Sequence, residues 1–503
     1  MPRPALLALA LCLALPAAAQ TTTPAALAAE VRAVLDDRAF ADAFWGAQIV
    51  NLATGETLLA RNADKRFIPA SNMKLVTTAA ALDALGPDFR YTTRLYADGE
   101  RRGGTLHGAL VVRGAGDPTL GGRYADGDPT RTFRAWADSL AARGIRRVTG
   151  PVIGDDDVFD DVALGRGWSW DDLVWAYAAE TSGLQFNEGT VELDVIGTAP
   201  GRPARVVVEP AVGDFVRVTN ASVTTEGGRI REGYARDLGA NDFTVTTSVP
   251  TGRTEEEAVA VVNPTLYFVT ALAEALRARG IETGGAVDGD DWPQPLRYDA
   301  MTRVALHHSP PLAAIAAQTN TDSNNLYAEH LLRTVGAEAG LAGEHPAGEH
   351  PAGEHPAGST AAGVAAAELF LQRAGVAPGA VTQIDGSGLS GMNRLTPSAV
   401  VAVLRAMDAH PDRPTRDAFY ASLAVGGESG TIERRYAVGD ARGNVRAKTG
   451  FITGARTLSG YVTSARGDRI AFALMCNSYS VPTSEVNAAQ DRIVEMLADY
   501  TGR

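Results

Sequence analysis

Ser71 and Lys74 are the two residues of this 503-residue sequence whose types and spacing point most directly to covalent catalysis. They lie three positions apart in a Ser-Asn-Met-Lys motif, where Pro69 opens a run rich in Leu and Ala that predicts a helix to about Leu85. Side chains three apart share one face of a helix, so we expect the amine beside the hydroxyl. Serine needs such a base to become a nucleophile, whereas the alternative interpretation is an exposed helical lysine.

Lysine usage strengthens the catalytic interpretation. The chain contains 46 lysines and arginines, and only Lys65, Lys74 and Lys448 are lysines. Arginine is never deprotonated in practice, whereas a lysine with a lowered pKa serves as a base. A lysine retained in an arginine-rich sequence therefore indicates a position that arginine cannot fill.

Two further motifs follow the first one along the chain. Ser323-Asn324-Asn325 lies at a turn inside a helical stretch, and Lys448-Thr449-Gly450 lies on an expected strand. Glycine within a strand lets a ligand approach the backbone closely. Taken alone, the second motif is equally a polar helix cap and the third an ordinary turn. The ordered series of Ser-x-x-Lys, Ser-x-Asn and Lys-Thr-Gly is far more specific than any of its parts.

Other catalytic and metal sites find little support in the sequence. Three of the eight histidines lie in a tandem Ala-Gly-Glu-His-Pro repeat at residues 342–356, which we interpret as a solvated loop rather than a metal-binding tract. The other five belong to no catalytic motif, and the sequence has no Gly-x-Ser-x-Gly or His-x-x-x-His pattern. The acidic run at residues 155–157 is expected to be a solvated turn. We therefore predict no metal ion and no cofactor.

Composition and the first residues indicate an exported protein without a stable membrane anchor. The net charge of -13 argues against a nucleic-acid partner. Arg3, the apolar run at residues 5–15 and three small residues before Gln20 match a signal peptide at residues 1–19, which predicts secretion across the inner membrane into the periplasm. No later stretch is apolar enough to cross a membrane, and the expected closing helix at residues 486–500 has an acidic polar face.

The expected elements place the three motifs on a mixed α/β scaffold. A hairpin is predicted at residues 45–61, and helix-rich sequence returns from Pro310. Between them, residues 91–289 consist of short strand-like runs separated by Gly and Asp turns. Three more strands are predicted near the end of the chain, at residues 446–448, 457–463 and 469–476. We therefore expect an α/β sandwich whose sheet is built from both ends of the chain.

The motif series resembles that of the penicillin-binding proteins and serine β-lactamases. Lys74 and Ser323 are 249 positions apart, and Asn325 and Lys448 are 123 apart. β-Lactamases lack so long a first interval, so the chain is similar to the low-molecular-mass class C penicillin-binding proteins, the D-alanyl-D-alanine carboxypeptidase/endopeptidase family. Further stretches that resemble this family are residues 309–312, 323–329, 385–390, 458–461 and 167–172.

The resemblance implies a penicillin-binding, serine β-lactamase-like α/β fold in which helices flank an antiparallel sheet. Residues 24–92 and 290–503 would form the peptidase domain, and residues 93–289 an inserted β-rich region. Two small modules are expected in that region, with residues 99–181 nested in residues 93–98 and 182–289.

The resemblance also implies acyl transfer from peptidoglycan peptides, with β-lactams as the other ligands. Lys74 would take the proton of Ser71, and a neutral Lys74 would need burial or a positive neighbour such as Lys448. Ser323 would relay a proton to the leaving amine. Asn325 would hold the peptide amide of the substrate.

The third motif would bind the other end of the substrate. Lys448 and Thr449 would hold the terminal carboxylate, the N–H groups of Ser71 and Phe451 would form the oxyanion hole, and Gly450 would let the substrate approach the strand closely. Phe451 departs from the family, in which a small or hydroxylated residue is common, and would tighten the site without altering its chemistry.

Asp172 is the expected contact for a free amino group on a peptidoglycan side chain. It follows Trp168 and Trp170 in a stretch that resembles one bordering the family's substrate pocket. A carboxylate among aromatic rings attracts an ammonium group while water is kept away. The alternatives are a structural Trp cluster with a solvated Asp172, and an equivalent role for Asp171.

Two other functions stay open on the sequence alone. One is a serine β-lactamase or esterase, and the other is a non-catalytic wall-binding protein on the same scaffold. The balance of carboxypeptidase and endopeptidase action, the peptidoglycan chemotype and the oligomeric state are also open.

Overall fold

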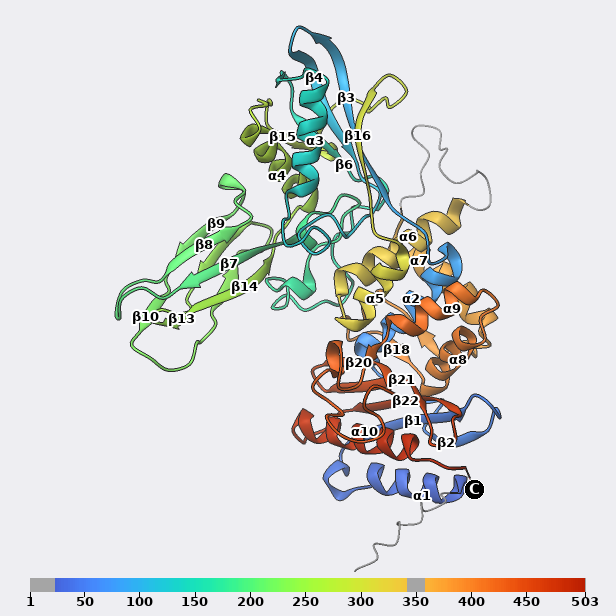
Figure 1. Cartoon of the computed structure of the whole chain (residues 1–503). Coiled ribbons are helices and arrows are strands. Elements are labelled where there is room, and N and C mark those ends of the chain that lie inside the picture. Colours follow the sequence, from blue (N-terminus) through green and yellow to red (C-terminus); the bar gives the residue numbers. More distant parts are fainter. Residues whose placement is uncertain (1–22, 342–357, 503) are drawn as a thin grey trace, which may run out of the picture.

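A six-stranded sheet built from both ends of the chain forms the base of the molecule (Figure 1). The structure, a computed structural model, describes residues 23–341 and 358–502, so the expected signal peptide and the Ala-Gly-Glu-His-Pro repeat lie outside the described residues. The strand order is β19-β20-β21-β22-β1-β2, and every pair is antiparallel, which confirms the predicted sheet. These strands are β1 (Phe44–Asn51), β2 (Thr57–Arg61), β19 (Ala424–Val425), β20 (Arg446–Ile452), β21 (Ala455–Thr463) and β22 (Arg469–Asn477).

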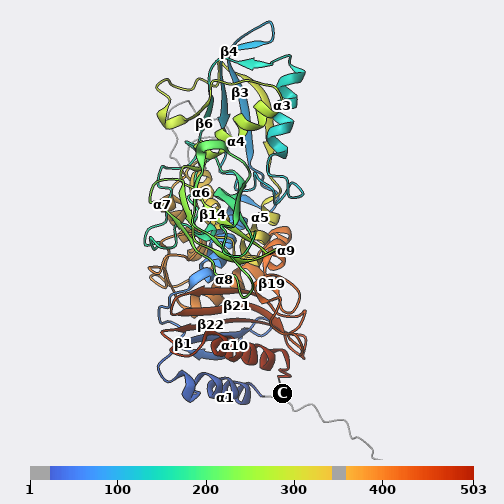
Figure 2. The same cartoon turned by 90° about the vertical axis from the view of Figure 1, so that its left-hand side faces the viewer.

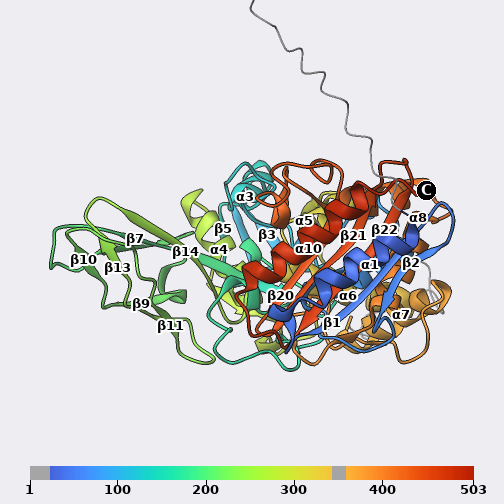
Figure 3. The same ribbon diagram turned by 90° about the horizontal axis from the view of Figure 1, so that it is seen from below.

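Helices cover both faces of this sheet. The first and last helices, α1 (Pro24–Leu35) and α10 (Thr483–Ala498), lie across one face, as Figure 3 shows from below, and share an apolar core with the strands. On the other face α8 (Pro397–Asp408) packs on β1 and β22. Beyond it lies a helical layer of α2 (Met73–Leu85), α5 (Leu312–Thr321), α6 (Asn325–Leu341), α7 (Thr360–Arg373) and α9 (Arg413–Ser422). Within the described residues, no helix is both long and apolar enough to cross a membrane.

The predicted helical stretch after Pro310 is interrupted at the second motif. α5 ends at Thr321 and α6 begins at Asn325. Ser323 between them has a φ of 64°, a left-handed conformation that side chains other than glycine rarely adopt. The break therefore turns the chain sharply and leaves the motif at the start of α6.

Residues 92–308 rise from the helical layer as a second body (Figures 1 and 2). Its larger sheet has the order β15-β6-β4-β3-β16, with β5 (Arg147–Val148) paired to β4. The helices α3 (Arg131–Ala142) and α4 (Pro264–Ala278) pack against this sheet. Its other strands are β3 (Thr92–Arg102), β4 (Thr105–Arg113), β6 (Val152–Asp155), β15 (Ala286–Asp288) and β16 (Thr302–His308).

A second group of strands lies between β6 and β15 in the sequence and projects to the left in Figure 1. They form the sheets β14-β7-β8, β11-β12-β9 and β10-β13. The strands are β7 (Thr190–Ile196), β8 (Arg205–Glu209), β9 (Arg217–Asn220), β10 (Val223–Thr225), β11 (Tyr234–Arg236), β12 (Asp242–Val245), β13 (Ser248–Pro250) and β14 (Thr254–Ala260).

The strand pairing indicates that the inserted region ends at a different residue from the one that the sequence predicts. β16 pairs with β3 although it follows the expected end of the region at residue 289. β15 pairs with β6 across the intervening strands of residues 190–260. We therefore propose that the region extends to His308, and that residues 190–260 are the nested module rather than the enclosing one.

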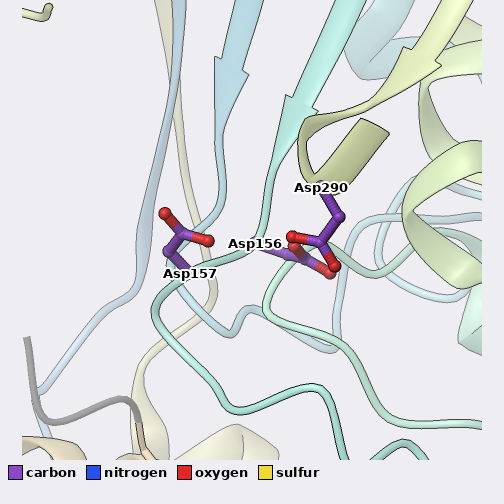
Figure 4. Close-up of side chains that lie close together, drawn as sticks. All are labelled: Asp156, Asp157 and Asp290. Carbon is purple, nitrogen blue, oxygen red and sulfur yellow. The ribbon is translucent and has the colours of Figure 1, made fainter. Parts of the chain in front are cut away.

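The acidic run at residues 155–157 is only partly the solvated turn that the sequence predicts, because Asp157 is exposed and Asp156 is half-buried. Asp155 is buried, because it ends an inner strand of the sheet, and Tyr298 donates a hydrogen bond to its carboxylate. Burial raises the pKa of Asp155 and of Asp156. The carboxylates of Asp156, Asp157 and Asp290 lie within 4.8 Å of one another, where the loop after β6 meets a short 3-10 turn (Figure 4).

Candidate active site

The first motif lies where the sheet meets the helical layer. One 3-10 turn, Ala70–Asn72, carries the half-buried Ser71 and leads directly into α2. Lys74 on the first turn of α2 is fully buried, and its Nζ lies 3.0 Å from Ser71 Oγ. The spacing of three thus brings amine and hydroxyl together, as the sequence predicts.

The surroundings of Lys74 favour its neutral form. Its Nζ also donates to Asn325 Oδ1 at 2.6 Å and to the Ser387 carbonyl at 2.7 Å. Burial lowers the pKa of Lys74 to about 7, against an opposing effect of the Asp385 and Glu329 carboxylates. An amine with this pKa is about half deprotonated at pH 7, so a substantial fraction can accept a proton.

Glu329 and Asp385 are functional candidates to which sequence analysis gave no role. Both are buried, Glu329 on α6 and Asp385 in the loop between the short strands β17 (Val381–Thr382) and β18 (Arg394–Leu395). Glu329 accepts hydrogen bonds from the backbone N–H groups of Gly386, at 3.0 Å, and Ser387, at 2.8 Å. Burial and the nearby Asp385 raise the pKa of Glu329 to about 7. Their only signal was that both lie in stretches quoted for the family resemblance.

The second motif contacts Lys74 through Asn325. Its Oδ1 accepts from Lys74, and its Nδ2 donates to the Tyr177 carbonyl at 2.7 Å. Tyr177 belongs to the inserted region, so one amide joins three distant parts of the sequence. Ser323 is half-buried at the turn before α6.

The third motif lies on β20, beside the turn that carries Ser71. Lys448 is fully buried, and its Nζ donates to the Thr449 carbonyl at 2.8 Å. Thr449 Oγ1 donates to Thr431 Oγ1 at 2.8 Å. Burial lowers the pKa of Lys448 far below its usual range, and repulsion from Lys74 adds to this effect. Burial, not the charge of Lys448, is therefore the main reason for the low pKa of Lys74.

Gly450 and Phe451 contribute to the site in different ways. A Cβ atom at Gly450 would lie 2.6 Å from the Pro69 carbonyl oxygen and 3.0 Å from Ser71 N, so only glycine allows β20 this close to the nucleophile. Side chains alternate along a strand, so the Phe451 ring lies on the opposite face. It is 55% exposed, and the Arg456 guanidinium lies 5.8 Å from its centre. The same alternation places the ring on the face of Thr449, so the narrower site expected from the sequence stays a prediction.

Residues 168–177 of the inserted region lie beside the second motif, and we call this segment the rim. Asp172 is half-buried and accepts a hydrogen bond from Tyr177 OH at 2.7 Å, whereas Asp171 accepts one from Ser169. Trp168 Nε1 donates to Asp385 at 3.0 Å. Asp172 is thereby linked to Asn325 through a single residue, Tyr177, which favours Asp172 over Asp171 as the carboxylate on the side of the second motif.

Comparison with known proteins agrees with this geometry. A model of the D-Ala-D-Ala carboxypeptidase 3 (S13) family matches residues 27–500. The chain belongs to this family. A D-alanyl-D-alanine carboxypeptidase of Actinomadura sp. (strain R39) is 34% identical over 94% of this chain and 84% of its own length. The family predicted from the three motifs is thus confirmed, and with it a serine peptidase.

More distant members of the family extend the likeness. The D-alanyl-D-alanine carboxypeptidase DacB of Haemophilus influenzae is 26% identical over 88% of both chains. The crystal structure of penicillin binding protein 4 (dacB) from the same organism superposes with a TM-score of 0.77 at 24% identity, and covers 94% of this chain and 99% of that one. This match confirms the predicted penicillin-binding fold.

Proposed function

We propose that this chain is a serine D-alanyl-D-alanine carboxypeptidase and endopeptidase that cleaves peptidoglycan peptides through an acyl-enzyme on Ser71. The observation that carries the proposal is the contact of 3.0 Å between Ser71 Oγ and a buried Lys74 whose pKa is about 7. The names of the relatives and the periplasmic destination expected from the signal peptide agree with a substrate in the cell wall.

Acylation begins when neutral Lys74 takes the proton of Ser71 Oγ. The oxygen attacks the carbonyl carbon between two D-alanines, so an O–C bond forms and the carbonyl oxygen becomes negative. The N–H groups of Ser71 and Phe451 stabilise this oxyanion, and removing one such donor typically costs about 100-fold in rate. The close packing of Gly450 on the Ser71 turn supports this assignment.

Collapse of the oxyanion breaks the C–N bond and releases D-alanine. The departing amine takes a proton from Ser323 Oγ, which regains one from the Lys74 ammonium. Asn325 holds the peptide amide of the substrate, and its position beside Lys74 supports that role. Water then attacks the ester carbonyl while Lys74 accepts its proton, and the bond between the carbonyl carbon and Ser71 Oγ breaks as Oγ takes that proton back.

Lys448 and Thr449 bind the terminal carboxylate of the substrate. Without substrate, burial lowers the pKa of Lys448 strongly. An arriving carboxylate favours the protonated form of Lys448, because opposite charges attract strongly in a buried site. The restored charge repels a proton on Lys74, so binding of the correct chain end makes the base more available.

Asp172 recognises a free amino group on the peptide side chain. Its link to Asn325 through Tyr177 supports this proposal. The exposed ring of Trp170, which lies on the same loop, offers a cation a second favourable surface.

β-Lactams acylate the same serine, because their carboxylate and strained amide resemble the end of the substrate. The test is incubation of the full chain with labelled penicillin, followed by mass spectrometry of the adduct. We expect a long-lived adduct on Ser71, D-alanine release from a D-Ala-D-Ala peptide, and loss of both in Ser71→Ala. An adduct elsewhere would refute the mechanism. Rapid penicillin turnover without peptide cleavage would identify a β-lactamase instead.

A further inference from the structure

The turn that carries Ser323 is held by an ion pair from the inserted region. Glu188 Oε2 accepts a hydrogen bond from Asn324 Nδ2 at 2.9 Å, directly after Ser323. Arg123 pairs with the same carboxylate, with Nη2 3.1 Å from Oε2. Its Nη1 also lies 3.5 Å from Asp322 Oδ2, directly before Ser323. Both neighbours of Ser323 are therefore tied to one charged pair.

Ser323 needs such support because of its backbone conformation. Its φ of 64° lies in the left-handed region, and a serine stays there only where the surroundings over-determine it. Asn324 provides this constraint with both ends of its amide. Nδ2 donates to Glu188, while Oδ1 accepts from Tyr327 N at 3.1 Å and caps α6. The direction of this amide thus fixes the turn.

The two loops that supply the ion pair are packed without space between them. A Cβ atom at Gly121 would lie 2.8 Å from Asn187 Cα, so the loop of Arg123 touches the loop of Glu188. Asn187 N donates to the carbonyl of Leu120 at 2.7 Å. The Glu188 carboxylate is therefore presented from a rigid base.

We infer that Glu188 is a positioning residue for the reaction, which acts through Asn324 to hold Ser323 Oγ where it meets the leaving amine. Arg123 orients the carboxylate, and Tyr327 OH donates to its other oxygen at 3.2 Å. The inference rests on the proposed role of Ser323 as proton relay.

A positioning role predicts a larger effect on rate than on stability. The Arg123 and Glu188 side chains are 40% and 24% exposed, and water screens such pairs, so they add little to folding. Proton transfer is far more sensitive, because a displacement of about 1 Å can cost about 100-fold in rate.

The test compares Glu188→Ala and Glu188→Gln with a control variant that breaks another ion pair between the inserted region and α6. The control is Asp160→Ala, because Asp160 of the inserted region pairs with Arg333 at 3.1 Å, about two turns further along α6. Acylation by penicillin is followed over a range of concentrations in the full-length chain, together with D-alanine release and the thermal unfolding midpoint.

Glu188→Ala is expected to lower the limiting acylation rate by about tenfold or more, with little change in the concentration for half-maximal rate. Glu188→Gln keeps an acceptor for Asn324 and should lose less. Asp160→Ala should change the acylation rate by less than about twofold, even if it unfolds at a lower temperature.

Two further readouts separate positioning from a loosened structure. Glu188→Ala and Asn324→Ala break the same hydrogen bond, so their effects on rate should be strongly non-additive in the double variant. The apparent pKa of the pH–rate profile should stay near 7, because Lys74 remains buried, while the plateau falls.

Equal rate losses in Glu188→Ala and Asp160→Ala, or additive effects of Glu188→Ala and Asn324→Ala, would overturn the inference. If Glu188→Ala does not fold, Glu188→Gln decides the comparison with Asp160→Ala. A wild-type chain that is not labelled on Ser71 would instead refute the proposed function, so the two failures are distinguishable.

Discussion

The buried ionisable residues Lys74, Lys448, Glu329 and Asp385, which we call the lysine cluster, lie next to the rim of the inserted region. The two regions differ in how far their polar groups are exposed to water. Around Lys74, ionisable groups such as Glu329 and Asp385 are buried and hydrogen-bonded to backbone N–H groups. On the rim, Trp170 is 74% exposed and Tyr177 45% exposed. One region keeps water away from charge, whereas the other stays open to it.

This difference indicates how each region acts on a substrate. Burial removes water from the Lys74 amine and lowers its pKa to about 7, while the buried carboxylates oppose this change, because little water screens their charge. A half-exposed carboxylate such as Asp172 interacts more weakly and suits selection between substrates. Substitutions in the cluster should therefore abolish chemistry, while substitutions on the rim should change preference.

The largest effect is expected from Lys74→Arg. A guanidinium cannot accept the serine proton, so acylation by penicillin should fall by about 1000-fold or more, within the range that general-base catalysis supplies. Lys448→Arg keeps a charge for the substrate carboxylate and should retain measurable acylation. The two rates are measured with labelled penicillin, and thermal unfolding serves as the control for folding. Equal, complete loss in both variants would contradict this division of roles.

The next effect is the pH dependence of acylation. Only neutral Lys74 accepts the proton, and its pKa is about 7, so the rate should rise with pH through 7 and level off above about 8. Glu329 opposes deprotonation of Lys74, so Glu329→Gln should lower that pKa and move the rising part of the profile to lower pH. Stopped-flow acylation between pH 5 and pH 9 measures both profiles. An unchanged midpoint in Glu329→Gln would show that the two groups are not coupled.

The sequence predicted only some of the residues that lie around Lys74. The first motif predicted the contact between Ser71 and Lys74, because a spacing of three reflects helix geometry. Glu329 and Asp385 could not be found in this way, since their effect comes from burial and from contacts between residues far apart in the chain. The same limit explains the mistaken solvated turn at Asp155, because an acidic run does not reveal that it ends an inner strand.

The sequence predicted the local elements and the sheet built from both ends of the chain, but it did not predict the strand pairing inside the inserted region. The hairpin β1–β2 and the three C-terminal strands follow from residue patterns that act over a few positions. The pairing of β16 with β3 joins residues about 200 positions apart, and many registers of short strands satisfy the same pattern.

A smaller effect is expected at Asp172, on the rim. The wild type should prefer a peptide with a free side-chain amine over its acetylated form, and Asp172→Asn should reduce this preference by about tenfold, as expected for one partly exposed charge pair. The ratio of the two kcat/KM values measures it. Asp171→Asn is the matched control, because Asp171 pairs with Ser169 instead. Preference that survives in Asp172→Asn would leave Asp172 without this role.

The smallest effect is expected at Phe451, where the cluster meets solvent. We propose its backbone N–H for the oxyanion hole, whereas its ring lies beside Arg456, on the opposite side of β20 from Gly450. Phe451→Thr should therefore change the acylation rate by less than about threefold, as expected for a substitution of an exposed side chain. Gly450→Ala, one position away, should lose most activity, because the added carbon would lie 2.6 Å from the Pro69 carbonyl oxygen. If Phe451→Thr instead alters acylation as strongly as Gly450→Ala does, the ring must reach the substrate. The residues needed for catalysis would then extend further along β20 than the buried cluster.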